Sequence, residues 1–120
     1  MSELQMGVGE KCFAEIIWAN EPISSGDLAK KSQEALGWKK TTSYTVLKRL
    51  CDKGLFKNES GTVTSLISKE EYDARQSEQF VSESFGGSLP AFLAAFTARK
   101  RLSPKEVTAL QQMIDEYKED

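Results

Sequence analysis

The chain has 120 residues, of which 39% are apolar and 28% charged, so it can bury one compact core or two small ones. This length excludes a large enzyme domain. Sixteen basic residues stand against eighteen acidic ones, a formal net charge of -2, so the overall charge indicates neither nucleic acid nor a membrane surface as a partner and any basic site must be local. The chain contains no histidine, which removes the commonest general base and the commonest metal ligand.

The two cysteines, Cys12 and Cys51, lie far apart and form no metal-ligand spacing or disulfide framework. We expect both to be buried and reduced, and we expect no cofactor. No apolar segment is long enough to span a bilayer, and residues 1–9 lack the order of a signal peptide. These features predict a cytoplasmic protein.

Three helices are predicted in the first half of the chain. The first covers Glu10–Asn20, where apolar residues recur at helical spacing. The second begins after Ser24 as N-cap, with Asp27 as the weaker partner of a capping box. The third runs from Thr41 or Thr42 to Lys53 and ends at a glycine.

The predicted third helix should turn one face to the core, formed by Leu47, Leu50, Cys51 and either Ser43 or Tyr44. After it the pattern changes to two β-favouring segments, Leu55–Lys57 and Thr62–Ile67, separated by a loop at Asn58–Gly61. Three helices followed by a hairpin are the order of a winged helix-turn-helix, whose third helix enters the major groove while the hairpin wing lies against the DNA backbone. We assign residues 1–67 to this DNA-binding domain.

Residues 68–120 are predicted to form three further helices and a dimerisation domain, so the fold class is mainly α with a small β-hairpin wing. Serines at 68, 88 and 103 mark the helix starts, the last with Pro104 and Glu106 in a complete capping box. Three such helices are too few to bury their own apolar side chains, which we expect to pack against a second copy of the chain. The alternative is that they fold back onto the first half. The predicted dimer interface comprises Phe80, Phe85, Leu89, Phe92, Leu93, Phe96, Leu110, Ile114 and Tyr117.

Basic residues concentrate in the predicted helix-turn-helix. Between Leu28 and Lys57 there are eight basic residues and two acidic ones, a net charge of +6, whereas residues 62–120 carry seven basic and ten acidic ones, a net charge of -3. A basic segment that coincides with the groove-facing element is typical of a duplex-DNA binder. On the third helix Thr42, Thr45 and Arg49 share one side, and these side chains can contact thymine methyl groups and guanine edges. The alternative is an ordinary solvated helix face.

The segment Trp38–Leu55 resembles the penicillinase-repressor family of winged-helix transcriptional regulators in its Trp, Thr and Tyr positions, its Leu-x-Arg-Leu run and its Lys-Gly-Leu end. Glu10 with Ile16–Trp18 resembles the first-helix signature of that family, and Ser68–Tyr72, Phe96, Leu102–Ser103 and Leu110 resemble its C-terminal half. The resemblance implies a homodimeric repressor that binds an inverted-repeat operator as double-stranded DNA.

The resemblance also implies that Thr41, Thr42, Tyr44, Thr45 and Arg49 face the DNA. With the neighbouring lysines and the wing, the predicted DNA-binding set is Lys39, Lys40, Thr41, Thr42, Tyr44, Thr45, Lys48, Arg49, Lys53, Lys57, Ser60 and Thr62. In well-known members of the family a membrane sensor-protease cuts the repressor between Asn and Phe, and the matching pair in this chain is Ala95 and Phe96. Copper-responsive relatives end in a cysteine cluster that is lacking at residues 117–120, so no metal site is predicted.

Three other interpretations stay open at this point. A winged helix can serve as a protein-interaction module, with its basic face bound to an acidic partner. An enzyme has little support, because the paired carboxylates Glu70–Glu71 and Asp115–Glu116 are adjacent on helices and point apart. A redox switch at Cys51 would need an exposed thiol, whereas the helix phase places this side chain inward.

Overall fold

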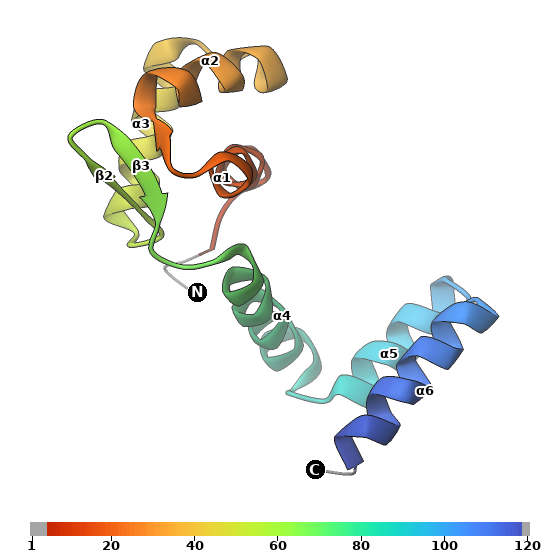
Figure 1. Cartoon of the computed structure of the whole chain (residues 1–120). Helices are drawn as coiled ribbons and strands as arrows, with labels where there is room; N and C mark the ends of the chain where they lie inside the picture. Colours follow the sequence, from red (N-terminus) through yellow and green to blue (C-terminus); the bar gives the residue numbers. More distant parts are fainter. Residues whose placement is uncertain (1–4, 119–120) are drawn as a thin grey trace. The chain divides into compact units, whose positions relative to one another are not determined.

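The structure is a computed structural model that describes residues 5–118. Its elements follow in the order α1 (Val8–Asn20), β1 (Ile23–Ser24), α2 (Ser25–Leu36), α3 (Lys40–Asp52), β2 (Phe56–Glu59), β3 (Thr62–Ser65), α4 (Lys69–Phe85), α5 (Leu89–Arg99) and α6 (Pro104–Lys118) (Figure 1). Three helices, a small sheet and three more helices confirm the predicted fold class. The prediction that residues 1–9 form no signal peptide lies partly outside the described residues.

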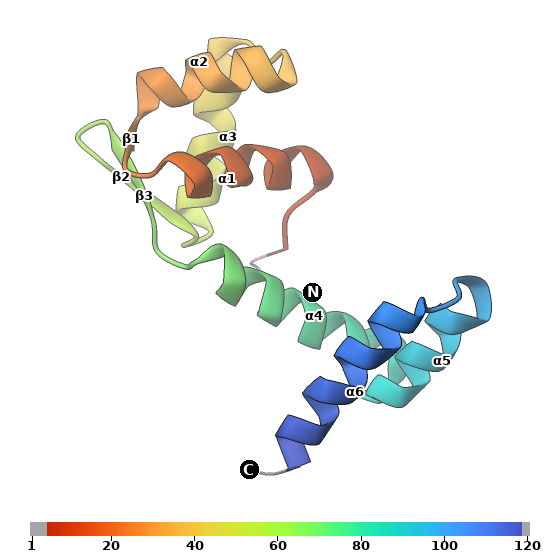
Figure 2. The same cartoon turned by 45° about the vertical axis from the view of Figure 1, so that its right-hand side comes forward.

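The first three helices surround the sheet's inner face in a helix-turn-helix arrangement, with α3 crossing behind α1 and α2 (Figure 2). The predicted start of α2 is confirmed, because the Ser24 hydroxyl accepts a hydrogen bond of 3.0 Å from the Asp27 amide. Gly37 ends α2 in the left-handed conformation, with φ of 70°, and its amide bonds to a carbonyl one turn back.

The sheet has three antiparallel strands in the order β1-β3-β2. Strand β1 was not predicted, because its two residues are extended only through pairing with β3, which lies far along the chain. The predicted loop at Asn58–Gly61 was too long. Strand β2 continues to Glu59, and the turn consists of Ser60 and Gly61, both at positive φ, which suits a two-residue hairpin.

A compact apolar core joins the three helices to the sheet. The fully buried large side chains come from α1, α2, α3 and the strand region: Phe13, Ile17, Leu28, Leu50, Leu55, Phe56 and Val63. On α3, Leu47 and Leu50 are buried as predicted, and of the two alternatives Ser43 and Tyr44 it is Ser43 that is buried while the Tyr44 ring is exposed; Val46 is also buried, and Cys51 is half-buried. Both cysteines are half-buried rather than fully buried.

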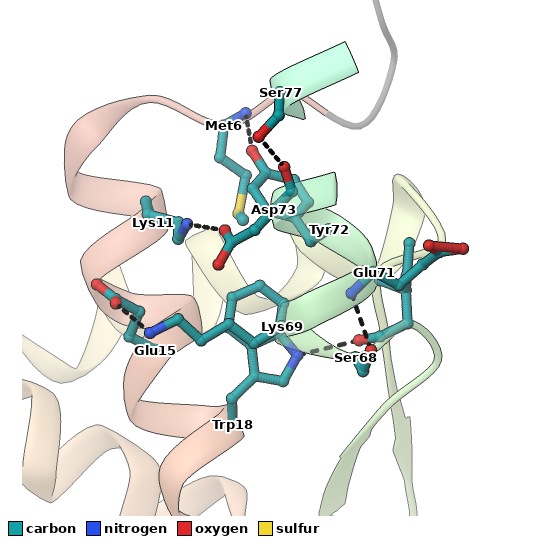
Figure 3. Close-up of polar contacts among 11 residues, drawn as sticks. Met6, Lys11, Glu15, Trp18, Ser68, Lys69, Glu71, Tyr72, Asp73 and Ser77 are labelled. Atoms are coloured by element: carbon teal, nitrogen blue, oxygen red, sulfur yellow. Dashed lines mark hydrogen bonds and ion pairs between the residues drawn. The ribbon is translucent and has the colours of Figure 1, made fainter. Parts of the chain in front are cut away.

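The first part of α4 also belongs to this core (Figure 3). Tyr72 is buried among the core residues, with its ring beside that of Trp18. Four polar contacts attach the segment: Tyr72 Oη to the Met6 amide at 3.1 Å, Lys11 to Asp73 at 2.8 Å, Lys69 to Glu15 at 3.1 Å, and Trp18 Nε1 to the Ile67 carbonyl at 3.0 Å. The compact units therefore divide after Gln79, inside α4, and not after Ile67.

The second compact unit begins at Phe80 and contains the end of α4 with α5 and α6. Both predicted helix starts are present, since Ser88 accepts from the Ala91 amide and Ser103 and Glu106 form a reciprocal capping box at 2.9 and 3.1 Å. No residue of α5 or α6 is buried. Within residues 5–118 no helix combines the length and the apolar character needed to cross a membrane.

Candidate nucleic-acid interface

Helix α3 presents a continuous polar surface to solvent. Because α3 packs on the core through Ser43, Val46, Leu47 and Leu50, the remaining positions point outward at helical spacing. Of the twelve predicted DNA-binding residues, Lys53 is half-buried and the other eleven are exposed. The exposed ones are Lys39, Lys40, Thr41, Thr42, Tyr44, Thr45, Lys48, Arg49, Lys57, Ser60 and Thr62. The structure thus leaves the α3 members of the set at positions that point away from the core, spread around the rest of the helix surface.

The first turns of α3 carry short hydroxyl side chains and an aromatic ring. The Thr45 hydroxyl donates to the Thr41 carbonyl at 2.9 Å, so its acceptor lone pairs and its methyl group remain available at the surface. The ammonium of Lys40 lies 5.8 Å from the centre of the Tyr44 ring, a cation–π geometry that favours one position for both side chains. Such groups can contact thymine methyl groups and base edges in a major groove.

Two of the exposed lysines have acidic neighbours. Lys48 lies 3.3 Å from Asp52, one turn along α3, and Lys57 lies 3.2 Å from Glu59 on β2. Ion pairs at exposed positions contribute little because water and salt screen them. These lysines can therefore exchange their carboxylate partners for phosphates.

The wing is tied to the helix-turn-helix at its tip. The Gly61 carbonyl accepts a hydrogen bond of 2.8 Å from the Ser25 amide at the start of α2, and the Asn58 side chain accepts one of 3.0 Å from the Gly61 amide. These bonds fix the turn that carries Ser60, next to Thr62. The hydroxyls of Ser60 and Thr62 are thereby exposed on a rigid hairpin.

Glu10 is a site residue that the sequence reasoning missed. Its carboxylate lies between the last turns of α3 and the start of α1, with Oε2 at 3.7 Å from Arg49 Nη1 and Oε1 at 3.5 Å from Lys53 Nζ. Oε1 also accepts a hydrogen bond of 3.0 Å from the Gly7 amide. This amide holds the pKa of Glu10 below its usual value, burial opposes the shift, and the two cations add to it.

A signal for this contact was present in the sequence. Glu10 precedes Phe13, Ala14 and Ile17 by three, four and seven residues, so it lies on the stripe of α1 that faces the core. An acidic residue on an otherwise apolar stripe predicts a partnered, half-buried carboxylate. The identity of its partners could not be read, because α3 lies about forty residues away along the chain.

Cys51 offers little support for a redox switch. Its thiol is half-buried beside Asp52. Burial, and to a smaller extent the charge of Asp52, raise the pKa of the Cys51 thiol. A raised pKa leaves little reactive thiolate at neutral pH.

The second unit carries the apolar surface predicted for dimerisation. Of the nine predicted interface residues, Phe80, Leu89, Phe96, Ile114 and Tyr117 are exposed, and Phe85, Phe92, Leu93 and Leu110 are half-buried. The four phenylalanine rings form a chain of edge and tilted contacts with centres 5.6 to 6.1 Å apart. Val107 and Met113 are also exposed on α6 and extend the apolar surface beyond the predicted set. No group of potential metal ligands occurs among the residues that the structure describes.

Comparison with known proteins places this architecture among transcriptional repressors. The model of the penicillinase repressor family matches residues 6–116. The chain is 28% identical over 118 residues to the penicillinase repressor of Bacillus licheniformis, an alignment that covers 95% of this chain and 92% of that protein.

Proposed function

The chain belongs to the penicillinase repressor family, which is a family of transcriptional repressors and not of enzymes, and from this premise we propose that it represses transcription as a homodimer on an inverted-repeat operator. Helix α3 of each protomer enters a major groove, and the wing contacts the neighbouring backbone. The apolar surface of the second unit holds the two protomers together.

One observation carries the DNA-binding part of this proposal. The exposed members of the predicted set lie on α3, at its start and on the wing, and all but Ser60 and Thr62 fall in the segment Leu28–Lys57, whose net charge is +6 while the chain as a whole is at -2. Short hydroxyl side chains and one arginine suit base edges, and the flanking lysines suit phosphates. An α-helix on a rigid core with this distribution is suited to a major groove.

The dimer part rests on the second unit. From Phe80 to Lys118 no side chain is fully buried, although large apolar residues such as Phe96 and Ile114 are present. Monomeric proteins seldom expose apolar patches beyond a few hundred Å², so a second copy of the chain is the partner that covers this surface. Two-fold symmetry then requires two half-sites whose centres lie about one helical turn of DNA, roughly 34 Å, or a multiple of it apart.

Selection from random duplex DNA tests the proposal directly. The purified protein should enrich a dyad-symmetric sequence, and its affinity for that sequence should exceed that for a scrambled duplex by about a thousandfold or more at physiological salt. Enrichment of no sequence, with binding that depends only on salt, would contradict the proposal and favour an acidic protein as the partner of the basic face.

Two substitutions separate base readout from phosphate contact on the enriched duplex. Arg49→Ala should relax sequence choice at one position of each half-site, at a cost of roughly 1 to 3 kcal/mol per contact. Lys39→Ala should weaken binding to all sequences alike, because a phosphate contact carries no sequence information. An Arg49→Ala protein with unchanged sequence preference would show that α3 does not read bases through this side chain.

Proteolytic release by a membrane sensor-protease is part of the proposal only through the family resemblance. The matching bond, Ala95–Phe96, lies inside α5 with both residues exposed, so a protease would have to unwind the helix locally. Cleavage there would remove α6 from the apolar surface. Mass spectrometry of the protein from derepressed cells would detect the fragment that begins at Phe96, and intact protein in such cells would contradict this route.

A further inference from the structure

Glu10 is a half-buried acid that contacts two basic residues near the end of α3. Its side chain is 17% exposed and lies on the core-facing stripe of α1. A carboxylate withdrawn from water requires compensating donors or charges. The Gly7 amide donates a hydrogen bond of 3.0 Å to Oε1, and two cations of α3 form ion pairs with the carboxylate, Lys53 at 3.5 Å and Arg49 at 3.7 Å, while Oε2 accepts no hydrogen bond.

The two cations differ in how firmly they are held. Arg49 and Lys53 lie one helical turn apart, so their charges would repel without the carboxylate between them. Lys53 also donates a hydrogen bond of 2.9 Å to the Gln5 carbonyl, and its side chain is largely withdrawn from solvent. The Arg49 side chain remains 55% exposed, although its Nη1 atom lies 3.7 Å from the carboxylate.

The Arg49 ion pair is too long for a hydrogen bond, but because the Glu10 carboxylate is only 17% exposed its charge is less screened than that of a surface acid and favours arginine rotamers that stay beside it. A side chain that is already held in its bound orientation loses less entropy when it contacts a base. An acidic group near phosphates also lowers the general attraction of the surface for any duplex. Both effects raise the ratio of specific to non-specific binding.

We propose that Glu10 is a positioning residue for base readout, which holds Arg49 in one orientation toward the DNA and keeps Lys53 away from the phosphates. This inference rests on the proposed DNA-binding function. A merely structural strut between α1 and α3 would act differently, because its loss would weaken binding to every duplex. Loss of a positioning residue instead strengthens non-specific binding while it lowers sequence discrimination.

The test compares the Glu10→Gln protein with the wild-type protein on two duplexes, the sequence enriched by the wild-type protein and a scrambled version of equal length. Affinities are measured over a range of salt concentrations. We expect tighter binding of Glu10→Gln to the scrambled duplex, and a salt dependence steeper by about one released counterion per protomer as Lys53 reaches a phosphate. The ratio of the two affinities should fall about tenfold, the order of one disordered arginine–guanine contact.

Glu15→Gln is the matched control. It removes the same charge from the same helix, but the partner of Glu15 is Lys69 on α4, not a residue of α3. We expect this variant to leave the affinity ratio unchanged. Equal changes of the ratio in Glu10→Gln and Glu15→Gln would overturn the inference, because the effect would then come from net charge alone.

Two further variants keep the test decisive if Glu10→Gln is poorly folded. Glu10→Asp keeps the charge but withdraws the carboxylate by one methylene, so the ratio should fall with little change in salt dependence. In an Arg49→Gln background, Glu10→Asp should lower the ratio no further. The inference would be overturned if Glu10→Asp kept the affinity ratio of the wild-type protein. It would also be overturned if Glu10→Asp lowered this ratio as much in the Arg49→Gln background as in the wild-type background. A wild-type protein that prefers no duplex would contradict the proposed function itself.

Discussion

The two compact units of this chain bury their apolar residues in opposite ways. Up to Gln79, side chains from helices and strands interlock in one core with seven large fully buried apolar residues. From Phe80 to Lys118 there is no fully buried residue, and large rings lie at the surface, with Phe80 52% and Tyr117 83% exposed. The first unit thus encloses a core of its own, whereas the second leaves large apolar side chains at its surface, where we propose the dimer interface.

The difference does not follow from apolar content. Helix α5 reads LPAFLAAFTAR and buries nothing, whereas α2 reads SGDLAKKSQEAL and buries Leu28, Ala29 and Ser32. In the first unit α2 has a sheet and two other helices to pack against, whereas within the described part of the second unit α5 has only α6 and the end of α4. The division of the chain thus separates a unit with a core of its own from a unit that leaves its large apolar side chains at the surface.

The largest expected effect comes from separating the units. A fragment of residues 80–120 should be unfolded when dilute, because so short a chain without disulfides or metals rarely stabilises itself. A fragment of residues 1–79 should fold as a monomer with a cooperative transition. Circular dichroism over a range of concentrations measures both. A melting transition of the dilute 80–120 fragment that does not depend on concentration would show that the second unit folds alone, and would contradict the contrast between the two units.

Ile114→Asp should have the next largest effect. A charge in the exposed stripe of α6 opposes burial at the proposed interface, so the protein should become monomeric and lose on the order of a hundredfold in operator affinity as the second half-site is no longer linked. Sedimentation equilibrium and DNA titration check this. Gln112→Asp, which lies on the polar side of the same helix, is the control and should remain dimeric.

Tyr72→Ala should destabilise the first unit alone. Its side chain is 4% exposed and its hydroxyl accepts a hydrogen bond from the Met6 amide. Truncation should therefore lower the free energy of unfolding of this unit by about 3 kcal/mol. Both tryptophans, Trp18 and Trp38, lie in this unit, and their fluorescence during urea unfolding therefore reports it selectively. Phe96→Ala in the second unit is the control, and we expect it to leave the midpoint of this transition unchanged. An unchanged midpoint in Tyr72→Ala would show that α4 is merely a linker.

Acid should weaken the first unit in part through Glu10, the smallest of these effects. Its pKa is lower in the folded protein than the usual 4.5, chiefly through the Gly7 amide, so the unfolded chain binds more protons between the two values. This stabilisation is complete above about pH 4.5 and is lost as the pH falls through the folded pKa. Glu10→Gln should flatten that part of the stability profile of the first unit, measured by tryptophan fluorescence, and an unchanged slope would contradict the assignment.

Local chemistry explains what could be predicted from the sequence. The starts of α2 and α6 could be predicted because the hydroxyls of Ser24 and Ser103 accept hydrogen bonds from amides only three residues away. A capping motif of four consecutive residues records such a contact. The exposed face of α3 was found because helical spacing separates Thr42, Thr45 and Arg49 from the core stripe.

Contacts across long stretches of chain explain what was missed. Strand β1 is extended because Ile23 pairs with Val63. The end of the first unit lies inside α4 because Asp73 and Lys69 pair with Lys11 and Glu15. The partners of Glu10 were hidden for the same reason, since such pairings depend on a tertiary arrangement that no local pattern encodes.

The stoichiometry of the complex on the selected duplex tests the central claim most directly. Sedimentation of the protein with this duplex should give two chains per DNA, and scrambling one half-site should lower the affinity by on the order of a hundredfold or more. One chain per duplex, with an affinity that does not depend on the second half-site, would contradict a dimeric operator-binding repressor.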